Sequence, residues 1–283
     1  MAFPRTMVEG KSLSRMIIGT NWLLGWSHTG AAADKRITEH HHCKENIFEV
    51  VGEFMDHGID TLMGPVFQNP IMAETVQYAQ QKTGKKLHVI DTPILNVSNT
   101  TESRREAEKV IKEVAKGGAE ICLIHHSSAE QLVNKGTQTI ERLDDYTKMI
   151  RDAGMIPGLS AHMPELIVYS DQNGYDVQTY IQIYNCMGFL MQVEVETIAK
   201  LIQSAKKPVM TIKPMAAGRT TPFVGLNFVW NTIRDCDMVT VGCFSRDEAA
   251  EDIEISLAAL ERRFPEMEKR SSPNQDQAAF GKN

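Results

Sequence analysis

The segment EICLIHHS, residues 120–127, is a short apolar run that ends in two adjacent histidines. Cys122, Leu123 and Ile124 are typical of a buried β-strand. A strand directs successive side chains to opposite faces, so His125 and His126 cannot both fill the same core. Either one histidine is structural while the other is exposed, or the end of this strand is a functional site.

The same pattern, an apolar run followed by a polar stretch and then a helical stretch, occurs eight times. The runs are 14–23, 58–66, 86–95, 120–127, 156–163, 179–187, 208–216 and 237–245. Two of the intervening helices, 45–58 and 103–118, show apolar residues at three- and four-residue spacing and end at glycine. Eight such units predict an α/β fold, a parallel eight-stranded (β/α)8 TIM barrel. A doubly wound open sheet is the alternative, but no GxGxxG follows the first strand.

No linker or repeat divides the chain, so we expect one barrel domain over 1–263 and a flexible C-terminal tail over 264–283. The net charge of −6, without a basic run, argues against nucleic acid as a partner. The segment MAFPRTMVEGKS has no apolar core of the length typical of a signal peptide, so we expect none, and no apolar stretch approaches membrane-spanning length. The five cysteines are dispersed, which favours free thiols and a cytoplasmic location. The expected partner is a small-molecule substrate.

Seven of the nine histidines fall where a (β/α)8 barrel carries its site, at the carboxyl ends of the strands. His28, His40, His41 and His42 lie in the first strand-to-helix connection, and His125, His126 and His162 follow strands four and five. Imidazole titrates near neutral pH and binds Zn, Mn, Ni or Fe. We expect His40, His41 and His42 to be solvated, and the three strand-end histidines to be functional.

Two aspartates, Asp60 and Asp91, lie within apolar strand segments. A buried carboxylate is costly unless it is paired or ligated, so each is either a site residue or an acceptor for backbone N–H groups.

Several segments together resemble the aldo-keto reductases, in family order over nearly all of residues 8–260. They are GKSLSRMIIGTN, HGIDT, CLIHH, GLSAHMPE, TYIQIYN, TIKPMAAGR and VGCFSRDEAAEDIE. The resemblance implies catalytic roles for Asp60 and His125. The chain departs from the family where a catalytic tyrosine and lysine are expected, since DTLMGPVFQNP has no tyrosine and VIDTPILN has no lysine. It therefore looks like a divergent member.

The same resemblance implies a nicotinamide cofactor, NADP or NAD. Ser160 and Gln182 would hold its carboxamide, and further residues its phosphates and adenosine. Those residues are Lys213, Gly218, Arg219, Gly242, Ser245, Arg246 and Glu251.

Three functions follow as hypotheses. The first is an oxidoreductase of a small carbonyl compound or sugar, in which His125 or His126 replaces the tyrosine as proton donor and Asp60 or Asp91 orients it. The second is a divalent-metal lyase, hydrolase or isomerase of a sugar or keto-sugar, with Mn, Zn or Ni held by a histidine cluster. Its ligands would be His125, His126 and His162, with Asp91. The third is a non-catalytic binding barrel. Trp22 and Trp26 either stack on a sugar or fill the barrel rim.

Overall fold

Eight parallel strands close into a barrel in the computed structural model, which describes residues 2–267. The order around the barrel is β10-β11-β12-β3-β4-β5-β6-β9, so each strand lies beside its neighbour in the chain and the last pairs with the first. The predicted TIM barrel is confirmed. The barrel strands are β3 (Met16–Gly19), β4 (Thr61–Gly64), β5 (His88–Asp91), β6 (Ile121–Ile124), β9 (Ile156–Ala161), β10 (Tyr180–Ile183), β11 (Val209–Ile212) and β12 (Met238–Val241).

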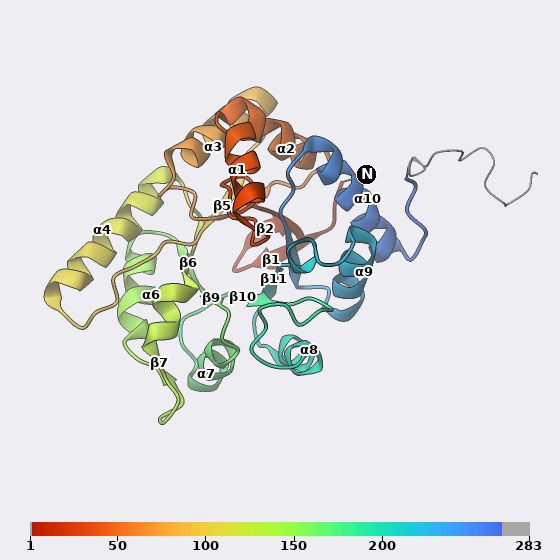
Figure 1. Cartoon of the computed structure of the whole chain (residues 1–283). Coiled ribbons are helices and arrows are strands. Elements are labelled where there is room, and N and C mark those ends of the chain that lie inside the picture. Colours follow the sequence, from red (N-terminus) through yellow and green to blue (C-terminus); the bar gives the residue numbers. More distant parts are fainter. Residues whose placement is uncertain (1, 268–283) are drawn as a thin grey trace, which may run out of the picture.

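A helix follows each barrel strand, and these helices surround the central strands (Figure 1). They are α2 (Lys44–Asp56), α3 (Pro70–Thr83), α4 (Thr101–Gly117), α6 (Leu143–Asp152), α7 (Glu165–Asn173), α8 (Val195–Ser204), α9 (Pro222–Thr232) and α10 (Arg246–Glu261). The two helices anticipated from periodicity, α2 and α4, are present with nearly the expected bounds. The αL glycine Gly118 caps α4, as its sequence predicted.

The connections carry additional short elements. The loop after β3 contains α1 (Ala31–His40), and the loop after β6 contains α5 (His126–Ala129), η1 (Glu130–Leu132) and the hairpin of β7 (Val133–Asn134) and β8 (Thr139–Ile140). The turn η2 (Ala216–Gly218) follows β11. Because loops at the carboxyl ends of barrel strands form the site, these insertions shape its mouth.

Strand alternation sorts the core into two layers. Ile90, Leu123 and Ile181 point into the barrel, whereas residues such as Val89 and Cys122 pack between the barrel and the helices. The hairpin of β1 (Arg5–Val8) and β2 (Lys11–Ser14) closes the amino end of the barrel, where its apolar side chains join the inner layer. The opposite end is therefore the open one.

The barrel accounts for the chain from β3 to the end of α10. Residues 264–267 of the expected tail lack helix or strand, and residues 268–283 lie outside the described part of the structure. In residues 2–267, no helix combines the length and the apolar character that crossing a membrane requires.

Candidate functional site

A cavity of about 1020 Å³ opens at the carboxyl ends of the strands. Most of the residues that the sequence singled out line it, and they come from five of the eight strand ends and the connections or helices that follow them. Those residues are Trp22, Trp26, His28, His125, His126, Ser160, His162, Lys213, Gly218, Arg219, Gly242 and Glu251. The mouth of the barrel is therefore the candidate site.

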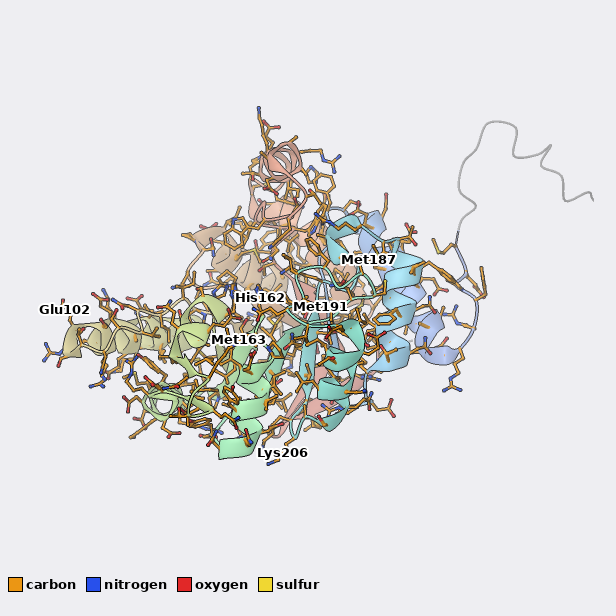
Figure 2. The ribbon with its side chains drawn as sticks, turned by 60° about the horizontal axis from the view of Figure 1, so that its bottom comes forward. Glu102, His162, Met163, Met187, Met191 and Lys206 are labelled. Carbon is orange, nitrogen blue, oxygen red and sulfur yellow. The ribbon has the colours of Figure 1, made fainter. Side chains whose placement is uncertain are left out.

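Three histidines gather at one side of this cavity. His125 follows Ile124 and continues the alternation of β6 toward the cavity, and His162 does the same after β9. Figure 2 labels His162 beside Met163 in the central part of the molecule. His126, the first residue of α5, lies between His125 and His162. Its ring centroid is 4.2 Å from that of His125 and 3.7 Å from that of His162, with which it stacks. The adjacent histidines of the sequence are thus both part of the site.

Glu130 joins this cluster from η1, one helical turn beyond His126. Its Oε1 accepts hydrogen bonds from the backbone N–H groups of His162 (2.7 Å) and Met163 (2.9 Å). Its Oε2 lies 3.9 Å from Nδ1 of His126. Burial alone would raise the pKa of this carboxyl, but His126 and the two N–H donors hold the pKa below its usual value. Glu130 therefore carries a negative charge beside two imidazoles.

His126, Glu130 and His162 form a set of potential metal ligands. One nitrogen or oxygen of each lies within 4.8 Å of the others. Two histidines and a glutamate, with further positions open, are a donor set that suits catalytic zinc and related divalent ions. The sequence-based set named His125 instead of Glu130. His125 does not belong to the group, and its Nδ1 forms a hydrogen bond with the Ser127 hydroxyl at 2.8 Å.

Burial keeps His125 and His162 neutral. It lowers the pKa of His125 to about 4 and that of His162 to about 3, with a further contribution from His126 in each case. The pKa of His28 is also lowered, first by burial and then by the charge of Lys213. A neutral imidazole can accept a proton or bind a metal ion, so either function is open to His125 and His162.

Lys213 enters the cavity from the end of β11. Burial lowers the pKa of its ammonium group to about 8. Its backbone has a φ of 60°, in the left-handed region that non-glycine residues seldom adopt. The sequence-based expectation placed Lys213 against a pyrophosphate, whereas the structure places it among His28, His125 and His162, whose pKa values its charge lowers.

Two residues expected in the site face the helices instead. Asp91 is the last residue of β5, next to the inward Ile90, and is fully buried. Its Oδ2 accepts the Phe67 N–H at 2.8 Å, so it is a backbone acceptor and neither orients a proton donor nor ligates a metal. Gln182 is likewise next to the inward Ile181 and is absent from the cavity wall, so it cannot hold a carboxamide there.

Asp60 lies at the opposite end of the barrel. It precedes β4, and its carboxylate forms an ion pair with Arg5 of the hairpin that closes the amino end, at 2.9 Å. Asp60 and the histidine cluster are therefore at different ends of the strands. The expectation that Asp60 acts in catalysis is corrected.

The amino end of α10, expected to bind phosphates, is capped by residues of the chain itself. Ser245 Oγ accepts the Glu248 N–H at 3.2 Å, and the Glu248 carboxylate accepts the N–H of Phe244, the residue before this N-cap, at 2.7 Å, an arrangement similar to a capping box. Arg246 forms an ion pair with Glu53 at 2.6 Å. Ser245 and Arg246 are absent from the cavity wall.

Acidic side chains line the cavity near this helix instead. Glu248, Glu251 and Asp252 all border it, and burial raises the pKa of Asp252 to about 7. Carboxylates oppose the binding of a phosphate, so this wall favours uncharged or cationic groups.

The remaining histidines of the first connection lie outside the cavity wall. His41 is buried, and its Nε2 bonds the Phe244 carbonyl at 3.0 Å, which corrects the expectation that it is solvated. His42 is exposed and bonds the Glu39 carbonyl through Nδ1.

Comparison with known proteins reveals a likeness of fold. A scan against models of protein families and a search of curated proteins found no match. Among solved structures, a candidate aldo-keto reductase from Pseudomonas aeruginosa is 13% identical, with a TM-score of 0.64 over 90% of this chain and 95% of that one. An aldo/keto reductase from Klebsiella pneumoniae, solved with NADP and acetate, is 13% identical, with a TM-score of 0.56 over 95% and 98%.

Barrels with other chemistry are similar as well. A type I 3-dehydroquinate dehydratase from Clostridium difficile is 11% identical, with a TM-score of 0.50 over 92% of this chain and 99% of that one. The fold is thus like that of aldo-keto reductases and of other TIM-barrel enzymes, and function has to be argued from the site.

Proposed function

We propose that this barrel is a divalent-metal-dependent lyase or isomerase that acts on a small carbonyl compound or a sugar. The observation that carries the proposal is the convergence of His126, Glu130 and His162 at the wall of the cavity. A metal held there supplies a Lewis acid for a carbonyl or hydroxyl oxygen of the substrate. The cytoplasmic location and the class of the substrate stay predictions.

The protein groups around the set fit this role. Two backbone N–H groups hold one oxygen of Glu130, which fixes the orientation of the other toward His126. His125 is neutral, and its Nδ1 accepts the Ser127 N–H at 3.3 Å, so its Nε2 carries the ring proton and can donate a hydrogen bond to a substrate oxygen. Trp22 and Trp26 line the cavity and offer apolar faces to a sugar.

Metal analysis tests the proposal. Protein purified without chelators and then dialysed against Mn, Zn or Ni is expected to retain about one ion per chain, and its melting temperature is expected to rise. His162→Asn should abolish both effects, whereas His42→Asn, which alters an exposed histidine outside the cavity, should abolish neither. Less than about 0.1 ion per chain, without a thermal shift, would contradict the proposal.

An NAD(P)-linked oxidoreductase is the second candidate. It is supported by the size of the cavity and by the presence in its wall of Ser160, Gly218, Arg219 and Gly242. Titration with NADPH and NADH, followed by the fluorescence of Trp22 and Trp26, tests it. Quenching that saturates would support a dinucleotide, and the absence of any change with either would exclude it.

A further inference from the structure

Lys213 is a half-buried amine that forms no hydrogen bond or ion pair within residues 2–267. Its side chain lines the cavity. Other lysines of the barrel ends are paired: Lys11 and Lys86 both contact Glu120, and Lys207 bonds Gln178. Removing an unpaired ammonium group from water is unfavourable, so its retention here calls for a chemical reason.

The backbone turns this amine into the cavity. Ile212, the last residue of β11, borders the cavity, so regular alternation would direct the next side chain toward the helices. Lys213 adopts a φ of 60° instead, immediately before Pro214, and its side chain joins the cavity wall. Strained backbone conformations of this kind cluster at functional sites, where the position of the side chain outweighs the conformational energy of the backbone.

The surroundings keep part of this amine unprotonated near neutral pH. Burial lowers its pKa to about 8, and no carboxylate contributes to hold the proton. The titratable and charged groups that border the same cavity are His28, His125, His126, His162, Arg219, Glu248, Glu251 and Asp252. An unprotonated, accessible amine is a nucleophile for carbonyl carbon.

We propose that Lys213 is the nucleophile of this site and that it condenses with a small aldehyde or ketone to form an imine. The amine nitrogen bonds to the carbonyl carbon while the C=O pair moves to oxygen, which takes up a proton. Loss of water from this carbinolamine, with loss of the second proton of nitrogen, gives C=N. The carbonyl class rests on the proposed function, but the imine does not require the metal.

Reductive trapping tests this assignment in the whole protein. The wild-type chain is incubated with dihydroxyacetone or with pyruvate, reduced with sodium borohydride, digested, and mapped by mass spectrometry. The reduced adduct is expected on Lys213 at least about tenfold faster than on any other lysine, with a rate that rises as the pH passes through about 8. Lys213→Arg should lose the adduct, and Lys207→Arg, at the opposite end of the same strand, should keep it.

The two proposals fail separately. Trapping is repeated after treatment with EDTA, where an unchanged adduct on Lys213 is expected. Adducts distributed evenly over surface lysines with both carbonyl probes would overturn the imine and leave the metal proposal standing. Absence of bound metal together with a fast adduct on Lys213 would overturn the metal proposal alone. Because the mapping uses wild-type protein, it does not depend on whether the Lys213 variant folds.

Discussion

The imidazole rings of His126 and His162 stack with their centroids 3.7 Å apart and their planes inclined by 19°. Two protonated imidazoles at this distance would repel each other strongly in a partly buried site. At least one ring must therefore be neutral, in keeping with the low pKa of His162. The negative charge of Glu130 beside this pair favours a cation near the three side chains. That cation can be a bound metal ion or a proton on one ring.

Replacing Asp60 should leave the cavity unaffected. The Asp60→Asn variant loses an ion pair with Arg5 at the amino end of the barrel, and partly exposed pairs of this kind contribute about 0.2–1 kcal/mol. We expect a correspondingly small loss in the free energy of unfolding, measured with urea. Metal retention and carbonyl trapping should equal those of the wild type, and a large loss of either would restore Asp60 to the site.

Ser245 should act as a helix cap. Ser245→Ala removes the acceptor of the Glu248 N–H at the start of α10, which costs about 1 kcal/mol. The expected result is a lower midpoint of denaturation, with NADPH titration identical to that of the wild type. Ser245→Asp, which keeps a capping oxygen, is the matched control and should recover the stability. Loss of dinucleotide binding in the alanine variant alone would instead support a phosphate contact.

The fold could be predicted because its signal is repeated. Eight apolar runs separated by helical periodicity indicate a barrel even when single bounds are uncertain, and the barrel rule then places each strand end on one face. The histidines after β6 and β9 were located in this way. Helices α1 and α5 were missed, since α1 lies in a polar stretch and α5 has only four residues, too few to show a period.

The inward or outward direction of single side chains was harder to predict. Asp91 was a candidate because it is an acid within an apolar strand, and Gln182 because of the resemblance to aldo-keto reductases. Both face the helices, because a position one residue along a strand belongs to the opposite face. The chemistry of Lys213 depends on a left-handed φ at a non-glycine residue, for which the sequence has no marker. Glu130 had a usable signal, its i,i+4 spacing from His126.

Asp91 should make stability depend on pH. Burial raises its pKa from 3.8 to about 7 in the folded state, so the folded chain holds a proton that the unfolded chain releases between these values. Its contribution is therefore fully present below about pH 4 and is lost as the pH rises to about 7, by roughly 1.4 kcal/mol for each unit of pKa difference.

Urea denaturation at several pH values measures this dependence. Asp91→Asn keeps an oxygen for the Phe67 N–H but cannot ionise, so its stability should fall less between pH 4 and pH 7 than that of the wild type. Asp152→Asn, which alters an exposed partner of Lys148, serves as the control and should retain the wild-type slope. Equal slopes in all three proteins would show that Asp91 is ionised in the folded state.

Two variants of Glu130 should distinguish its role in binding metal from its role in holding the loop that carries His162. Glu130→Gln keeps an oxygen for the N–H groups of His162 and Met163, so the fold should be retained while metal affinity falls by about 100-fold or more. Glu130→Ala also leaves those two N–H groups without their acceptor, which adds a loss of stability of about 1–3 kcal/mol. Calorimetric metal titration and urea denaturation of both variants measure the two effects. Undiminished metal affinity in Glu130→Gln would remove Glu130 from the ligand set, and equal stability of the two variants would show that its Oε1 does not support the loop.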